Sequence, residues 1–145
     1  MTAFLDTSAI VKLYVDEPGH VEVRAIEGPF VAAEIAIVEF ASAVWRKSRL
    51  GELSAPRAAL LVRAFREATR PNGPDRLRMS LIGTDSVVLA RATAIVARHD
   101  LRAYDSVQLA SALLAHEALD GCRFASFDHR LDAAAAAEGL ASAFA

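Results

Sequence analysis

Short apolar runs alternate along the chain with longer segments in which apolar residues recur at helical spacing. The short runs are typical of strands buried in a sheet, and they cover Thr2–Leu5, Phe30–Ala33, Leu77–Ile82 and Cys122–Phe127. Helical periodicity predicts helices over residues 8–15, 20–27, 34–49, 54–68, 85–99, 104–119 and 128–139. The last segment, "LASAFA" (140–145), is compatible with an edge strand.

This alternation predicts an α/β fold with a doubly wound parallel sheet of about 4–5 strands, flanked by helices on both faces. The chain has 145 residues, which suits a single domain over residues 1–145. The segment "RPNGPDR" (70–76) is a loop by composition, and its role within Arg70–Arg78 stays open. In such sheets, ligands bind beyond the carboxyl ends of the strands, where the strand order reverses.

Acidic residues stand at two of these predicted strand ends and on two apolar helices. Asp6 follows the first strand and Asp128 follows the strand "RFASF". Glu39 lies on a narrow polar stripe of a helix that is otherwise apolar, together with Ser42 and Arg46. An ion pair between Glu39 and Arg46 is an alternative explanation of that stripe, because a partly buried carboxylate needs a partner.

Helix capping is the alternative explanation for the other acids. Asp105 precedes Gln108 by three residues near the start of a helix, which matches a capping box. Asp6 and Asp128 are each placed to cap the helix that follows them. Glu39 is not a cap, however, and four acids at one sheet edge repel one another unless protons or cations intervene. Carboxylate oxygens without clustered cysteine or histidine favour Mg²⁺ or Mn²⁺.

Composition indicates the cellular compartment that we expect for this protein. Hydrophobic residues make up 54% of the chain, and Cys122 is its only cysteine, so no internal disulfide can form. The N-terminus lacks the pattern of a signal peptide, and no apolar segment is long enough for a membrane span. We therefore expect a cytoplasmic protein without membrane contacts.

The charged residues behind the net charge of −2 are unevenly distributed along the sequence. Residues 1–45 carry a net charge of −5, residues 46–78 carry +6, and residues 79–145 carry −3. The basic middle segment is either a pair of solvated helices or a positive surface that faces phosphates or an acidic partner.

Four segments together resemble PIN-domain ribonucleases, in particular the VapC-like toxins of type II toxin–antitoxin systems. They are "FLDTSAIVKLY", "AAEIAIVEFASAVWR", "HDLRAYDSVQLASAL" and "FASFDHRLDAAAAAEGL", in the family's order and at similar spacing. The resemblance implies that Asp6, Glu39, Asp105 and Asp128 form the acidic catalytic site. It also implies that the hydroxyl of Ser8 supports the metal shell.

The family's mechanism implies Asp6, Asp105 and Asp128 as ligands of Mg²⁺ or Mn²⁺, with Glu39 binding a second ion or orienting water. A metal-bound water would hydrolyse the RNA phosphodiester and leave a 5′-phosphate and a 3′-hydroxyl. Arg46 is a candidate phosphate contact. His129, beside Asp128, is expected to be exposed and not catalytic.

The resemblance further implies a homodimer, an RNA substrate and a cognate VapB-like antitoxin, with DNA contacted only through the antitoxin. A non-catalytic PIN-like module that binds RNA or a partner is the main alternative. Phosphohydrolases of the haloacid dehalogenase type need a second acid where Ser8 stands, and they and receiver domains need a late lysine. The chain has only Lys12 and Lys47, so both classes are disfavoured.

Overall fold

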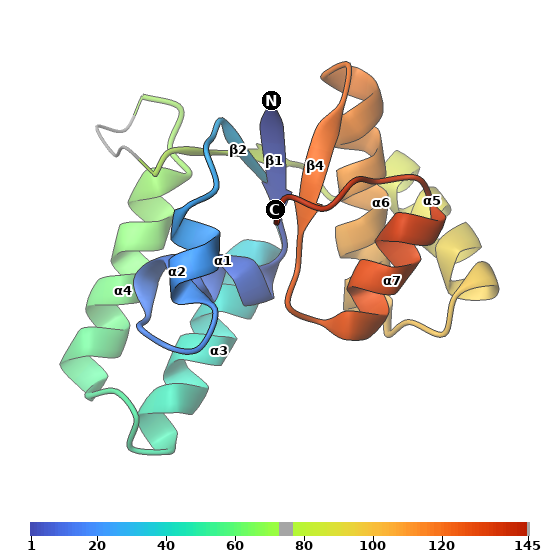
Figure 1. The fold of residues 1–145 in the computed structure, drawn as a ribbon. Coiled ribbons are helices and arrows are strands. Elements are labelled where there is room, and N and C mark those ends of the chain that lie inside the picture. Colours follow the sequence, from blue (N-terminus) through green and yellow to red (C-terminus); the bar gives the residue numbers. More distant parts are fainter. Residues whose placement is uncertain (73–76, 145) are drawn as a thin grey trace.

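A computed structural model describes residues 1–72 and 77–144 of the chain (Figure 1). Within these residues, four short strands form one parallel sheet in the order β3-β2-β1-β4. The strands are β1 (Thr2–Leu5), β2 (Phe30–Ala33), β3 (Met79–Ile82) and β4 (Cys122–Ala125). The predicted α/β fold with a parallel sheet is therefore confirmed, with four strands.

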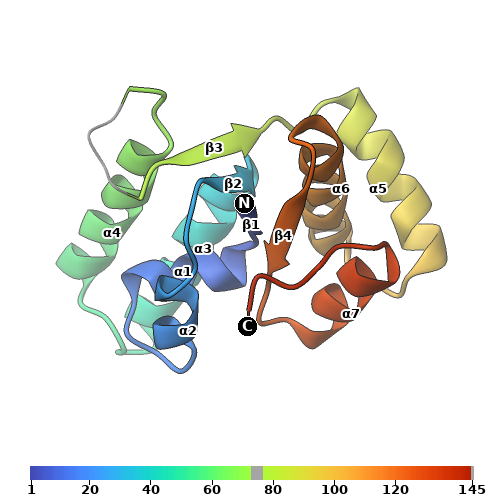
Figure 2. The same cartoon turned by 45° about the horizontal axis from the view of Figure 1, so that its top comes forward.

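Seven helices in the described residues cover the two faces of this sheet, as Figure 2 shows. They are α1 (Thr7–Tyr14), α2 (His20–Arg24), α3 (Ala36–Arg49), α4 (Ala55–Ala68), α5 (Ser86–Arg98), α6 (Ala103–Ala118) and α7 (His129–Ala137). Helices α1 to α4 lie on one face, and α5 to α7 lie on the other. The predicted helices differ from these mainly by a few residues at their ends.

Alternating strand residues supply the two cores that hold these layers together. Leu5 of β1 faces the core shared with α1, α3 and α4, whereas Phe4 faces the core shared with α5, α6 and α7. This alternation follows from the two-residue period of a strand. Phe4 stacks on Phe124 of β4, with ring centroids 5.9 Å apart, which ties the two central strands together.

The predicted last strand, "LASAFA", is not formed beyond a single parallel bridge between Phe124 and Ser142. The backbone N–H of Phe124 donates to Ala141, and that of Ala143 donates to Phe124. The chain then turns so that Phe144 packs on Phe127, with ring centroids 4.9 Å apart. Ala145 lies outside the described residues.

Two other predicted strands are shorter in the structure. β3 begins at Met79 and not at Leu77, and β4 ends at Ala125 and not at Phe127. Beyond Ala125, the hydroxyl of Ser126 accepts a hydrogen bond from the backbone N–H of Asp128, which turns the chain. The role of the loop Arg70–Arg78 stays open, because its residues 73–76 lie outside the described residues.

The strand order reverses at β1, and this fixes where a site can form. The connections from β1 through β2 to β3 run over one face of the sheet, and the connection from β3 back to β4 runs over the other. The carboxyl ends of β1 and β4 therefore flank the position at which parallel sheets of this kind bind ligands. In the part of the chain that the structure describes, no helix is long and apolar enough to cross a membrane.

Candidate functional site

Asp6 lies directly after β1 and is held in place by three hydrogen bonds. Its Oδ1 accepts from the backbone N–H of Ala9 at 2.9 Å and from the hydroxyl of Ser8 at 2.6 Å. Its Oδ2 accepts from the hydroxyl of Ser126 at 2.6 Å. Asp6 thus caps α1, as one interpretation of the sequence predicts, and also contacts the segment that follows β4. The two interpretations of this residue do not exclude each other.

Burial makes the ionised form of the Asp6 carboxyl energetically unfavourable. The residue is only 4% exposed, and this burial raises the pKa of its carboxyl to about 6 against the opposing effect of the three hydrogen bonds. The charge of Asp128 makes a smaller contribution to the same rise in pKa. A nearby cation would lower it, because an opposite charge favours the ionised form of a carboxyl. The position therefore favours binding of a cation.

Two hydroxyl groups connect Asp6 to the segment after β4. Ser8 accepts from the backbone N–H of Phe127 at 2.9 Å while it donates to Asp6. Ser126 accepts from the backbone N–H of Asp128 at 3.0 Å while it donates to the same carboxylate. Asp128 in turn caps α7, because its Oδ1 accepts from the first backbone N–H groups of that helix. Sequence reasoning missed Ser126, although its place directly after a buried strand was a usable signal.

Glu39 is half-buried on α3 and takes part in a second group of hydrogen bonds. Its Oε1 accepts from the Thr7 hydroxyl at 3.0 Å and from Nε2 of Gln108 at 2.7 Å. Gln108 also donates to the Thr7 hydroxyl at 3.0 Å. Because Thr7 follows Asp6 directly, Glu39 is held beside the carboxyl end of β1. Among the described residues, no ion pair joins Glu39 to Arg46, which is exposed, so that alternative is wrong.

The capping box proposed for Asp105 and Gln108 is also not formed. The N-cap of α6 is Arg102, and no side chain makes a capping hydrogen bond there. Gln108 is 1% exposed and points to Glu39, not to the start of its own helix. A buried amide needs hydrogen-bond partners. Nε2 of Gln108 has them in Glu39 and Thr7, whereas its Oε1 has none among the described residues. Asp105 lies in the first turn of α6 but does not cap that helix.

Asp105 and Asp128 meet at the guanidinium of Arg102. Arg102 Nε donates to Oδ2 of Asp105 at 3.0 Å, and Nη2 lies 3.5 Å from Oδ2 of Asp128. The two carboxylates are therefore no further apart than one guanidinium can bridge. Neither points away into solvent, although capping also holds for Asp128. His129 is exposed, as predicted.

The donor set suits a hard divalent cation such as Mg²⁺ or Mn²⁺, because it consists of carboxylate and hydroxyl oxygens. Asp105 and Asp128 already converge on one cationic group, and Ser126 connects Asp128 to Asp6. In residues 1–72 and 77–144, no three histidine, cysteine or acidic side chains are gathered as a ready metal-binding group. The residues present fit such an ion by the type of their donor atoms, and two of the acids are in contact with Arg102 instead.

A groove with a volume of about 720 Å³ opens beside these residues. Thr7, Glu39 and Arg102 form its end at the acidic site, and it continues along α3 past Arg46 and Lys47. The exposed ring of Tyr104, next to Asp105, also lines it. Lys47 is paired with Glu17 and Glu52, so Arg46 and Tyr104 are the side chains of this groove that suit a nucleic-acid strand. A cation can contact phosphates, and an exposed ring can stack on bases.

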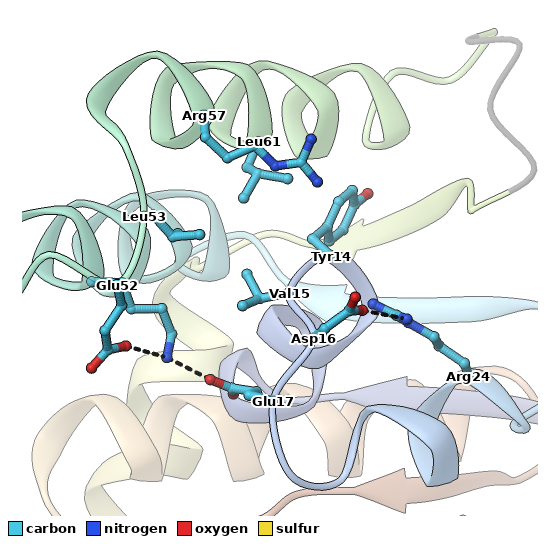
Figure 3. A pocket seen from close by; sticks show the side chains of 10 residues that line it. Tyr14, Val15, Asp16, Glu17, Arg24, Glu52, Leu53, Arg57 and Leu61 are labelled. Atoms are coloured by element: carbon cyan, nitrogen blue, oxygen red, sulfur yellow. Dashed lines mark hydrogen bonds and ion pairs between the residues drawn. The ribbon is translucent and has the colours of Figure 1, made fainter.

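A second pocket, of about 530 Å³, lies on the face covered by α1 to α4 (Figure 3). Most of its charged side chains pair with each other: Asp16 binds Arg24 at 2.7 Å, and Lys47 binds both Glu17 and Glu52. These contacts neutralise part of the basic middle segment within the chain itself. Because all of its acidic side chains are already paired, we assign no chemistry to this pocket.

Comparison with known protein families identifies the family of this chain. The PIN domain family matches residues 3–137, which is most of the chain. The chain belongs to the PIN domain family. PIN domains are in general nucleases that use divalent metal ions, so the match supports phosphodiester hydrolysis by this chain. No curated protein matches the chain.

Proposed function

We propose that this PIN domain is a metal-dependent endoribonuclease and the toxin of a type II toxin–antitoxin pair. Two observations support the nuclease assignment: the chain is a PIN domain, and Asp105 and Asp128 both contact Arg102 at the reversal of strand order. Ser126 links Asp128 to Asp6, and Thr7 links Glu39 to the same strand end. The resemblance of four sequence segments to VapC-like toxins supports the finer assignment to RNA and to a toxin.

In this proposal, Asp6, Asp105 and Asp128 hold a Mg²⁺ or Mn²⁺ ion. Such an ion supplies a nucleophilic water at neutral pH and stabilises charge that develops on the phosphoryl group. Ser8 and Ser126 keep the carboxylate of Asp6 oriented through their hydrogen bonds to its two oxygens. The burial of Asp6 strengthens its attraction for a cation, because few waters compete for its charge.

Glu39 has the role of orienting the attacking water. Both of its hydrogen bonds within the described residues go to Oε1, which leaves Oε2 available to accept a hydrogen bond from water. Thr7 and Gln108 fix the side chain in this position. Arg46, further along the groove, contacts an RNA phosphate in this proposal, and the exposed Tyr104 stacks on a base.

The proposed partners follow from the same resemblance. The chain is expected to form a homodimer in the cytoplasm and to bind a VapB-like antitoxin, which alone contacts DNA.

Expression of the chain without its antitoxin should arrest growth of the host cell. Growth should return when Asp105→Asn is expressed in its place, and a variant that still arrests growth would contradict toxicity by RNA cleavage.

Cleavage of a mixed RNA pool by the purified chain tests the nuclease assignment. Cutting should require Mg²⁺ or Mn²⁺, stop with a chelator, and fall by roughly 10²-fold or more in Asp105→Asn, since the metal contributes several kcal/mol. Asp6→Asn, prepared identically, should be equally inactive. Asp100→Asn is the matched control, because Asp100 is exposed and pairs only with Arg130 at 3.6 Å among the described residues.

Each other result of this experiment has a definite meaning. Equal cutting by the wild type and the Asp105 variant would indicate a contaminating nuclease. RNA binding without any cutting, together with no toxicity on expression, would favour the non-catalytic binding module.

Replacing Gln108 by leucine should lower nuclease activity by roughly 10–100-fold, the usual effect of losing a residue that orients a catalytic group. Leucine fills a similar volume but cannot donate to Glu39 or Thr7. Ser111→Ala is the control on the same helix. Within the part of the chain that the structure describes, the buried Ser111 hydroxyl donates only to Val107 of its own helix. Initial cleavage rates of both variants, measured with their melting temperatures, separate positioning from folding. Full activity of Gln108→Leu would contradict this role.

A further inference from the structure

The backbone of Arg102 is fixed by hydrogen bonds, whereas its side chain is exposed. It is the N-cap of α6, and its carbonyl oxygen accepts from the backbone N–H of Ser106 at 3.0 Å and from the Ser106 hydroxyl at 3.1 Å. Its side chain is 80% exposed and contacts Asp105 and Asp128 through different nitrogens. The guanidinium can therefore leave the two acids by side-chain rotation alone, without any change in the fold.

The contacts of Arg102 are with two of the three carboxylates assigned to the metal ion. One positive charge reduces the repulsion between these acids while no divalent ion is bound. Exposed ion pairs of this kind contribute little free energy, so a divalent cation can displace the guanidinium. Since Arg102 also lines the groove beside the site, the displaced guanidinium remains next to the path assigned to RNA.

We propose that Arg102 is an internal substitute for the divalent cation. It holds Asp105 and Asp128 together in the metal-free protein, and it is released to bind an RNA phosphate in the groove when the ion binds. This inference rests on the proposed metal-dependent ribonuclease function. Its consequence is that Arg102 weakens metal binding but strengthens RNA binding to the metal-loaded protein.

Calorimetric titration of the metal-free chain with Mn²⁺ tests the first part. Arg102→Gln should bind Mn²⁺ roughly three- to tenfold more tightly than the wild type, because the ion no longer competes with an exposed ion pair. Arg130→Gln is the matched control. Its side chain is equally charged and 75% exposed, but it pairs with Asp100. Asp105→Asn should lose the tight site and so locate the bound ion.

The possible results distinguish failure of this inference from failure of the proposed function. Equal or weaker Mn²⁺ binding by Arg102→Gln would overturn the inference while the metal site stands. An equal gain in Arg130→Gln would also overturn it, because the effect would then be one of overall charge. Absence of Mn²⁺ binding sensitive to Asp105→Asn in both the wild type and Arg102→Gln would overturn the metal site and the inference together.

The second part is tested by the binding of a phosphorothioate-linked single-stranded RNA, followed by fluorescence anisotropy with and without Mn²⁺. Mn²⁺ should raise the RNA affinity of the wild type several-fold more than that of Arg102→Gln, because only the wild type releases a guanidinium into the groove. An equal effect of Mn²⁺ on both proteins would overturn the phosphate-binding role of Arg102.

Discussion

The Asp6→Asn variant is expected to melt at a higher temperature than the wild-type protein at pH 7.5 without metal, although it loses nuclease activity. The pKa of Asp6 is raised to about 6, so the folded protein binds a proton more tightly there than the unfolded chain does. At pH 7.5 the buried charge therefore costs up to about 3 kcal/mol of stability. Removing that charge should raise the melting temperature by roughly 5–10 °C.

The difference in melting temperature between Asp6→Asn and the wild type should depend on pH. The contribution of Asp6 to stability is fully present below about pH 4, and it is lost as the pH rises through the folded-state pKa of about 6. The gain in melting temperature of Asp6→Asn should therefore grow between pH 4 and pH 6 and then stay constant. Asparagine keeps an acceptor for Ala9 and Ser8, so the cap of α1 is retained.

Melting curves in a chelator from pH 4 to pH 8 check this expectation, and Mn²⁺ provides the second condition. The ion should stabilise the wild type, because it binds the folded state alone, and leave Asp6→Asn unchanged. Asp105→Asn is the comparison, because Asp105 is paired with exposed Arg102 and its loss should end activity without raising stability. A lower melting temperature of Asp6→Asn at pH 7.5 would contradict a costly charge at this position.

The sequence was sufficient to predict the fold and the edge of the sheet at which Asp6 and Asp128 lie. Strand and helix periods indicated a parallel sheet, and acids after two strands pointed to its carboxyl edge, where Asp6 and Asp128 lie. Glu39 was predicted as a partly buried acid because it interrupts an apolar helix. These inferences succeed because they depend on local periodicity and on one rule for parallel sheets.

The partners of these acids depend on the tertiary structure and could not be predicted from spacing. Gln108 was paired with Asp105 because they share a helix, yet the structure places it against Glu39, 69 positions away in sequence. Arg102 was not among the predicted site residues, and its contact with Asp128 spans 26 positions. Local patterns identify which residues need partners, whereas the packing of α3, α6 and α7 decides which partners they have.

Phe40→Ala should lower the free energy of unfolding by about 3–5 kcal/mol, the usual cost of truncating a fully buried phenylalanine. The ring of Phe40 is fully buried and lies between Tyr14 of α1 and Phe65 of α4, with centroids 5.3 Å and 4.7 Å away. It therefore anchors α3 against two other helices. Val38→Ala on the same helix is the control, because Val38 is 64% exposed and such changes stay within about 0.5 kcal/mol.

The packing of Phe40 should also affect the rate of RNA cleavage, because Glu39 is the next residue along α3. A cavity in place of Phe40 allows α3 to shift, and a shift of about 1 Å at a positioning group can cost roughly 10²-fold in rate. Phe40→Ala should therefore cut RNA more slowly than the wild type even at a temperature where denaturant titration shows it fully folded. Phe40→Leu, which leaves a smaller cavity, should lie between the two in both stability and rate. If Phe40→Ala loses the expected stability but retains the full rate, the position of Glu39 is fixed by Thr7 and Gln108 and not by the core beneath α3.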